Sequence, residues 1–211
     1  IDNYVDKNGN KIQPNARPGD FKFAKLGEEG PLNDDDDRTF IGDPNPDLIY
    51  GFNLGFAYKN LDVSMAFQGT LGNDIWNTAK GTLATAGNQN ALAEAYTNAW
   101  KQEGDVNVKY PRITNSDTNN NMRASSFYVE DGSYLRLQNM QIGYTLPSSV
   151  CQKTKLFSSC RFYISAQNLF TLTGYTGLDP EIGVDSPLNM GVDNTHYPTS
   201  RTFTLGVNLQ F

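Results

Sequence analysis

Apolar and polar residues alternate with a period of two along residues 48–58 and again along residues 61–70. Successive side chains of an extended strand point to opposite faces, so each stretch predicts a strand with one apolar and one polar face. Only two residues separate the stretches, which is typical of a tight β-hairpin. Such a loop pairs its flanking residues, here Tyr58 and Leu61, and both belong to the apolar set.

The same alternation runs through residues 201–211. One face of this predicted strand is entirely apolar and ends on an aromatic residue: Phe203, Leu205, Val207, Leu209 and Phe211. A strand of about eleven residues, tilted by about 45°, spans roughly 25 Å, which is the height of the apolar band of an outer-membrane barrel. The pattern therefore favours a strand that exposes this face to lipid.

Two further strands are predicted at residues 133–146 and 161–170. In the first, the apolar residues change from one face to the other midway. A β-bulge near Gln138 or Asn139 explains such a change, and so does a first half that rises above the membrane. In the second, the alternation decays at Gln167.

The connections between the predicted strands alternate between long and short. Residues 1–46, 71–132 and 171–200 form the long connections, and residues 59–60 and 147–160 form the short ones. Bacterial barrels show the same asymmetry, with long extracellular loops and short periplasmic turns. We therefore predict an all-β fold: about five C-terminal antiparallel strands of a large transmembrane β-barrel, with long extracellular loops. One short loop helix is predicted at residues 91–101.

Composition supports strands and argues against some functions. The chain has 211 residues with 11 Tyr, 12 Phe and 19 Gly. No run of about 18 apolar residues is present, so no transmembrane helix is expected. The net charge of −6 argues against nucleic acid as a partner. Because Ile1 is not an initiator and no leader pattern follows it, we expect a processed or partial chain.

Several short motifs follow one another along the chain. They are residues 37–46 (DRTFIGDPNP), 50–53 (YGFN), 68–77 (QGTLGNDIWN), 110–112 (YPR), 129–139 (VEDGSYLRLQN), 142–147 (IGYTLP), 165–173 (SAQNLFTLT), 177–181 (GLDPE) and 197–206 (YPTSRTFTLG). Together they resemble the C-terminal barrel region of SusC/RagA-type TonB-dependent transporters of Bacteroidetes, in the order in which that family carries them. Each motif is weak alone, but the set covers most of the chain.

The resemblance implies an outer-membrane barrel of about 22 strands, of which this chain would supply about the last five. It also implies import of oligosaccharides or peptides, powered through TonB and assisted by a SusD-like surface lipoprotein that caps the barrel. The plug, the TonB box and the other N-terminal parts of the family are not expected in this chain. The implied localisation is the bacterial outer membrane, and no cofactor is implied.

The loop before the DRT motif departs from the family. Family members often carry an Asp/Asn-rich stretch there that resembles a calcium loop, whereas residues 25–34 read KLGEEGPLND. Because the alternating oxygen ligands are missing, calcium binding is not expected. The acidic run at residues 34–37 offers oxygen ligands to a divalent cation, but a solvated loop is the favoured interpretation.

Aromatic residues in or beside the 71–132 loop are candidates for contact with substrate or lid. They are Trp76, Tyr96, Trp100, Tyr110 and Tyr128. Aromatic faces stack on sugar rings and anchor protein interfaces. The competing interpretation is that these residues pack the loop on itself, and for Trp76 that it lies in an aromatic girdle.

Other candidate chemistry is sparse. Cys151 and Cys160 share one short connection, where an oxidising periplasm favours a disulfide. Two cysteines do not make a zinc site, and His196 is remote in sequence, so no metal site is expected. Glu130 and Asp131 are adjacent, so in an extended chain they point apart and do not form the carboxylate pair of a glycosidase. We therefore do not expect an enzyme.

The apolar residues of the last strand have a second expected role. Phe203, Leu205, Val207, Leu209 and Phe211 resemble the terminal signal by which the barrel assembly machinery recognises outer-membrane barrels for insertion. Two other function classes share parts of the pattern. One is a secreted or surface β-sandwich that binds carbohydrate, whose apolar faces would pack sheet on sheet. The other is a TonB-independent porin or adhesin barrel.

Overall fold

A computed structural model gives the fold and describes residues 3–85, 90–154, 156–183 and 186–211. The chain divides into two compact units, each with its own internal packing. The loop unit comprises Ile1–Gly42, Trp76–Val129 and Val192–Thr195, and the sheet unit comprises Asp43–Ile75, Glu130–Gly191 and His196–Phe211.

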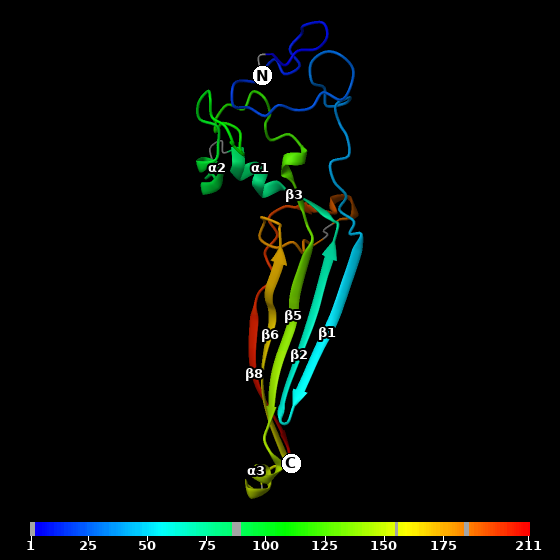
Figure 1. Ribbon diagram of the computed structural model, residues 1–211, viewed down its shortest axis with the longest axis vertical. Coiled ribbons are helices and arrows are strands. Elements are labelled where there is room, and N and C mark those ends of the chain that lie inside the picture. Colours follow the sequence, from blue (N-terminus) through cyan, green and yellow to red (C-terminus); the bar gives the residue numbers. More distant parts are fainter. Residues whose placement is uncertain (1–2, 86–89, 155, 184–185) are drawn as a thin grey trace. The chain divides into compact units, whose positions relative to one another are not determined.

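Five long antiparallel strands form the main sheet of the sheet unit, in the order β1-β2-β5-β6-β8 (Figure 1). They are β1 (Leu48–Tyr58), β2 (Leu61–Leu71), β5 (Tyr134–Thr145), β6 (Ser159–Thr173) and β8 (Thr202–Gln210). Each strand begins and ends within three residues of the range expected from the sequence. The β1–β2 turn, helix α3 (Ser148–Thr154) and the C-terminus lie at the same end of the sheet (Figure 1).

The register of the sheet places apolar and polar side chains on opposite faces of all five strands. One row of directly paired residues consists of Phe56, Val63, Ile142, Ile164 and Leu205. The adjacent row consists of Gly55, Ser64, Gln141, Ser165 and Thr204. Because neighbouring residues of a strand point to opposite faces, the sheet has an apolar face and a polar face.

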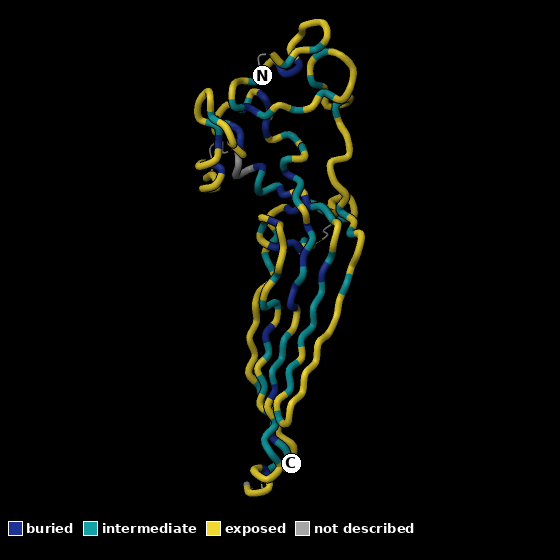
Figure 2. The backbone as a smooth tube through the Cα atoms, viewed as in Figure 1, coloured by how far each residue is buried: buried dark blue, intermediate teal, exposed yellow. Residues whose placement is uncertain are grey.

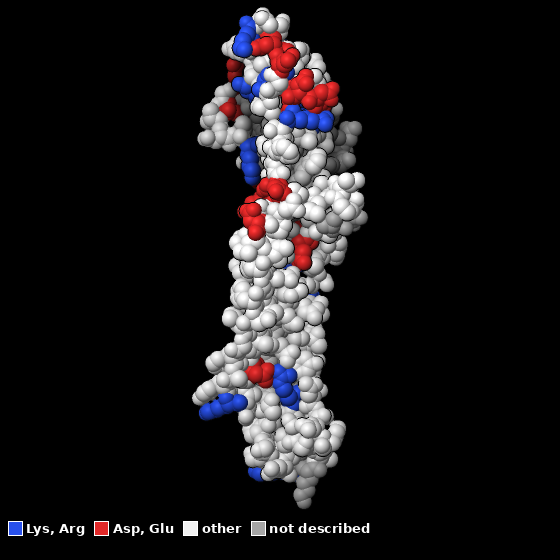
Figure 3. Space-filling view, turned by 90° about the vertical axis from the view of Figure 1, so that its right-hand side faces the viewer, with Lys and Arg blue, Asp and Glu red and all other residues white. Residues whose placement is uncertain are grey.

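Charge and exposure distinguish the two faces. The five strands contain three charged residues, Asp62, Arg136 and Arg161, and the register puts all three on the polar face. Figure 3 shows few charged side chains over the strands on the side of the molecule that it presents. On the apolar face, Phe56 is 61% exposed and Leu205 is 81% exposed, and Figure 2 shows extended exposure along β1 and β8. A β-sandwich would bury this face under a second sheet, so the exposure contradicts that alternative.

A β-bulge interrupts the sheet where the apolar pattern changes face. The pairing of β5 with β6 skips Gln138 on β5 and both Asn168 and Leu169 on β6. Asn168 has a φ of 52°, a left-handed conformation that asparagine tolerates better than most residues. The predicted bulge near Gln138 is confirmed, and it explains why the alternation of the fourth strand decays after Gln167.

The conformation of Asn168 leads to a testable expectation. We expect Asn168→Val to destabilise the sheet by about 1–3 kcal/mol, because a β-branched side chain is strained at positive φ. Asn168→Gly is the matched control, because it relieves the strain while losing the same side-chain bond to the Ser200 carbonyl (3.1 Å). The measurement is the temperature at which the full-length protein loses its folded migration on a gel. The same temperature for both variants would contradict the expectation.

The two cysteines lie on neighbouring elements of the sheet unit. Cys151 is on α3 and Cys160 near the start of β6, and both are buried; a disulfide between them stays a prediction. The sequence pattern treated residues 147–160 as a simple turn and did not predict α3. A disulfide needs the two Cβ atoms about 3.8 Å apart in a defined orientation. Here α3 packs against β6, and both cysteine side chains are buried.

The loop unit contains several short elements instead of the single predicted helix. They are α1 (Thr78–Thr85), α2 (Ala93–Thr97), the 3₁₀ helix η1 (Ser126–Tyr128) and β7 (Val192–Asp193), which pairs with the end of β3 (Asp74–Asn77). Helix α2 is shorter than the expected 91–101 because the Asn98 carbonyl accepts from the N–H groups of Lys109 (3.0 Å) and Tyr110 (3.2 Å). The chain therefore leaves the helix to form a bridge.

Two further short elements complete the chain, β4 (Val129–Asp131) and the 3₁₀ helix η2 (Pro187–Asn189). Over the part of the chain that the structure describes, no helix is long and apolar enough to cross a membrane.

Candidate functional site

Arg136 lies on the polar face of β5 and is only 2% exposed despite its charge. Its guanidinium donates to the carboxylates of Asp179 and Glu181, the latter at 2.7 Å from Nη1. It also donates to the hydroxyl oxygens of Thr171 (2.9 Å) and Thr199 (2.8 Å). All three guanidinium nitrogens are thus engaged, and together these residues form what we call the Arg136 anchor.

Asp179 is the acidic centre of the Arg136 anchor. The backbone N–H groups of Glu181 and Thr199 donate to it, each at 3.0 Å. Burial alone raises the pKa of the Asp179 carboxyl, but the hydrogen bonds from Thr199, Glu181 and Arg136 outweigh burial and hold the pKa below its usual value. The carboxylate therefore stays charged at neutral pH and ties the 171–200 loop to the sheet.

Farther along the polar face, long side chains lie flat on the sheet. Arg161 pairs with Asp62 (Nε–Oδ1 3.1 Å) and covers Gly143, where an added Cβ would come within 2.2 Å of the guanidinium. Tyr163 covers Gly206 in the same way. Glycines below these side chains let them lie close to the backbone. The side chains therefore project little from the polar face.

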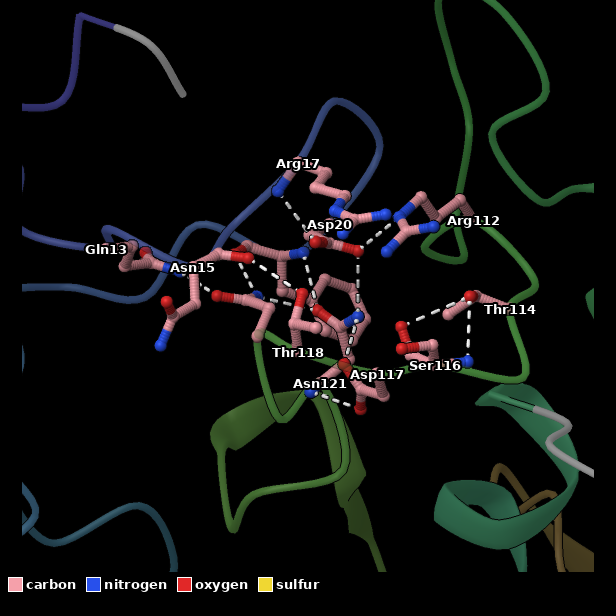
Figure 4. Close-up of polar contacts among 12 residues, drawn as sticks. Gln13, Asn15, Arg17, Asp20, Arg112, Thr114, Ser116, Asp117, Thr118 and Asn121 are labelled. Carbon is pink, nitrogen blue, oxygen red and sulfur yellow. Dashed lines mark hydrogen bonds and ion pairs between the residues drawn. The ribbon is translucent and has the colours of Figure 1, made fainter.

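A buried polar network holds the loop unit together (Figure 4). Asp20 accepts from Nε of Arg112 (2.7 Å) and from Nδ2 of Asn121 (3.0 Å). The Asn121 amide oxygen accepts from Asn119 (2.8 Å), whose own oxygen accepts from Gln13 (2.7 Å). Three of these bonds join residues that are 92, 101 and 106 positions apart, so the network fixes two distant loops against each other.

The same network satisfies backbone groups. The Phe21 N–H donates to the Asn121 side chain (2.9 Å), and the Phe23 N–H donates to the Gln13 side chain (2.7 Å). The Tyr128 hydroxyl donates to the Asn121 carbonyl (2.7 Å). A buried polar group without a partner costs about 1–3 kcal/mol, so these bonds stabilise one arrangement of the loops.

Two of the five candidate aromatic residues are interior residues. Tyr110 is 4% exposed and packs with Ala95 and Ala99, and Tyr128 is 1% exposed. Burial, and to a lesser extent the charge of Asp117, raises the pKa of Tyr128. Neither ring offers a surface to substrate or lid, which corrects the prediction for both. For these two residues the competing interpretation holds, namely that they pack the loop on itself. Their rings and the partners of their hydroxyl groups lie inside the loop unit.

The other three candidates are accessible. Tyr96 on α2 is 64% exposed, and Trp76 on β3 is 37% exposed and pairs with Val192. Trp100 lies against Gly19, where an added Cβ would come within 2.1 Å of the indole. Trp100 also lines a cavity of about 360 Å³ together with two lysines and two prolines. A contact of these three residues with substrate or lid stays a prediction.

A larger groove in the loop unit was not predicted from the sequence. It measures about 800 Å³, and its large apolar lining residues are Phe21, Phe23, Leu26, Leu32, Ile41 and Phe127. We call it the phenylalanine groove. The ring centroids of Phe21 and Phe127 are 4.7 Å apart, and those of Phe21 and Phe23 are 6.2 Å apart. Phe21 and Phe23 alternate along the chain, which is a local sequence signal for an apolar surface. No local sequence pattern connects these two residues with Phe127.

Asp37 organises the acidic loop that precedes the DRT motif. Its carboxylate accepts from the N–H groups of Leu26, Gly27 and Asn33 and from the Lys25 ammonium, each at 2.8 Å. Lys25 therefore supplies a positive charge at this carboxylate. Among the described residues, no group of three or more His, Cys, Asp and Glu side chains is arranged to hold a metal ion.

The hydrogen bonds to Asp37 set a pH dependence for this loop. Burial raises the pKa of the carboxyl, but three backbone N–H groups and Lys25 outweigh burial and hold the pKa well below 3.8. A depressed pKa adds stability that is present above the ordinary pKa and is lost as pH falls toward the folded-state value. We therefore expect protease protection of residues 25–37 to be constant from about pH 7 to 5 and to decline below about pH 4.

The variant Asp37→Asn tests this expectation. At neutral pH it is expected to raise cleavage within the loop about tenfold, because the amide loses the charge that binds Lys25. Asp35→Asn is the control, because it removes the same charge from the same acidic run at an exposed position. Cleavage that rises equally in both variants would contradict the role of Asp37.

Comparison with known proteins identifies the family, although no family model matches the chain. The TonB-dependent receptor P3 of Formosa agariphila is 40% identical over 206 residues, which cover 95% of this chain and 20% of that protein. The TonB-dependent receptor SusC of Bacteroides thetaiotaomicron is 27% identical over 206 residues, covering 93% of this chain and 18% of that protein.

A solved structure agrees with these relatives. The structure of the RagAB peptide importer in its closed-closed state aligns with a TM-score of 0.68 and 25% identity, covering 98% of this chain and 20% of that chain. The chain thus spans about a fifth of the length of the curated relatives that it matches. Its two-faced antiparallel sheet is that of a barrel wall in the outer membrane. The chain belongs to the SusC/RagA-type TonB-dependent receptors and corresponds to part of their β-barrel.

Proposed function

We propose that this chain is the C-terminal part of an outer-membrane importer that is energised through TonB. The single observation that carries the proposal is the two-faced sheet. Its apolar face is exposed and free of charge, and its polar face holds every charged residue of the five strands. In this proposal the apolar face meets lipid and the polar face lines the barrel interior.

The polar face supports passage of a bulky solute. Arg136 is neutralised by two carboxylates, and Arg161 and Tyr163 lie flat over glycines. The side chains therefore leave room inside the barrel instead of filling it. The relatives of the chain are TonB-dependent receptors, which supports the proposal that it moves or positions a solute and does not transform it.

The substrate class and the lid are further parts of the proposal. RagAB is described as a peptide importer, and SusC is a TonB-dependent receptor. We propose that the whole protein imports oligosaccharides or peptides together with a SusD-like surface lipoprotein. The loop unit supplies the contacts, and among the predicted residues Trp76, Tyr96 and Trp100 remain accessible for them.

Uptake by whole cells tests the proposal. Cells that carry the full-length protein and a SusD-like lipoprotein are given fluorescent oligosaccharides or fluorescent peptides, with and without TonB. We expect uptake of one class, and we expect it to disappear without TonB. Uptake that persists without TonB would contradict the proposal and favour the porin class.

The role of the last strand in assembly also stays a proposal. Its apolar residues are all exposed: Phe203, Leu205, Val207, Leu209 and Phe211. Because β8 is an edge strand of the sheet, its outer backbone groups can pair with an added strand of an assembly factor while its apolar side chains stay on one face.

A further inference from the structure

We propose that the phenylalanine groove is a docking site for an extended segment of a partner protein. The segment would carry a bulky apolar side chain next to an acidic group. This inference rests on the proposed function, because it assigns to the loop unit one specific contact with a protein partner. All residues that line the groove belong to the loop unit.

The floor of the groove fits a large apolar side chain. Phe127 packs against Phe21 at 4.7 Å between ring centroids, and Leu26 and Ile41 on the walls are 53% and 39% exposed. A volume of about 800 Å³ lies within the usual range for sites that bury a ligand. The groove therefore exposes apolar surface to water, and burying that surface under a partner side chain is favourable.

Two polar atoms in the groove lack partners in the described part of the chain. The Nε atom of Arg123 and the Oγ atom of Ser125 are buried, and neither has a hydrogen-bond partner. Arg123 is held in place by Asp34 (3.4 Å) and by the Phe23 ring (5.0 Å). The Nε–H can only donate, so the missing partner is an acceptor such as a carboxylate or a carbonyl oxygen.

The charges of the groove also favour an acidic partner. Lys22, Arg38 and Arg123 line it, together with Asp34 and Asp37. Asp37 is already occupied by Lys25 and by three backbone N–H groups. The positive charge that remains accessible in the groove exceeds the negative charge, so a carboxylate on the partner is complementary.

The surroundings identify a protein rather than a sugar. Among the described residues that line the groove, none is an asparagine or glutamine, whose amide side chains would bind sugar hydroxyls. Next to the lining residues in sequence, Phe40 is 100% exposed and Met122 is 47% exposed. Aromatic residues, methionine and arginine are the types enriched in protein interfaces.

A binding measurement on the full-length protein tests the inference. The probe is a fluorescent, end-blocked pentapeptide with glutamate, phenylalanine and aspartate at its centre. Its control replaces both acids by the corresponding amides. We expect the acidic probe to bind, and we expect Arg123→Lys to weaken it about tenfold, because lysine keeps the charge but lacks the Nε–H. Arg17→Lys, at an exposed arginine of the same unit, is the matched control variant.

A second variant keeps the test independent of folding. Ser125→Ala removes one hydroxyl and is expected to weaken the acidic probe about threefold. Equal binding by wild type, Arg123→Lys and Ser125→Ala would overturn the proposal, and so would competition by maltohexaose. Entry of the peptide into cells in a TonB-dependent manner would also overturn it, because the occupant would then be cargo and not a partner segment.

The outcomes separate this inference from the proposed function. Loss of peptide binding with intact TonB-dependent uptake of another solute would reject only the docking site. Intact peptide binding together with uptake that does not depend on TonB would reject only the proposed importer function.

Discussion

Replacing Arg136 by methionine is expected to release the 171–200 loop from the sheet. The guanidinium is 2% exposed and binds two carboxylates and two hydroxyls. Its removal leaves Asp179 buried without its cation, and breaking a buried ion pair in this way costs about 3–5 kcal/mol. In the full-length protein the expected results are an earlier loss of folded migration on heating and a loosened loop.

Chymotrypsin measures the loosening of that loop. Tyr175 is 6% exposed and is the informative cleavage site. Tyr197 is 93% exposed, but it is followed by Pro198, which blocks cleavage. We expect cleavage after Tyr175 in Arg136→Met and protection in the wild type.

Two further variants show that the effect belongs to a buried pair. Arg161→Met removes a pair whose acid, Asp62, is 40% exposed, so water and salt screen the loss and the effect is expected to be smaller. Arg136→Met combined with Asp179→Asn is expected to recover part of the stability, because the orphaned charge is gone. If Arg136→Met protected Tyr175 as well as the wild type does, the anchor would have no role in holding the loop.

The strands were predictable because their signal is local. A period of two over about ten residues fixes the faces of a strand whatever the partner is. The tight turn after Tyr58 fixes the register of the first hairpin for the same reason. The bulge at Gln138 was predictable because it reverses that period within a single strand.

The candidate site was much less predictable because its contacts are long-range. Arg136 meets Glu181 across 45 residues, and Gln13 meets Asn119 across 106 residues. Neither pair leaves a pattern in the local sequence. Tyr110 and Tyr128 failed as surface candidates for the same reason, since aromatic composition in a loop does not say which rings the loop buries. The helix predicted at 91–101 is present but shorter, because the backbone N–H groups of Lys109 and Tyr110 bind the Asn98 carbonyl at its end.

A charge placed on the apolar face is expected to block assembly of the barrel. Leu205 lies in β8, is 81% exposed and pairs directly with Ile164. If this face meets lipid, Leu205→Lys puts an ammonium into hydrocarbon at a cost of about 2–4 kcal/mol near the membrane midplane. The expected result is a strong loss of folded, full-length protein in the outer membrane, measured by the heat-modifiable band.

The neighbouring position supplies the matched control. Thr204 has almost the same place along the strand but belongs to the polar row with Ser165. Thr204→Lys is therefore expected to assemble nearly normally, because its ammonium faces water inside the barrel. The two variants add the same charge one residue apart, so composition and strand propensity cannot explain a difference between them. Equal assembly would mean that lipid does not cover the row from Phe56 to Leu205, and the exposed apolar face would then need a protein neighbour to cover it.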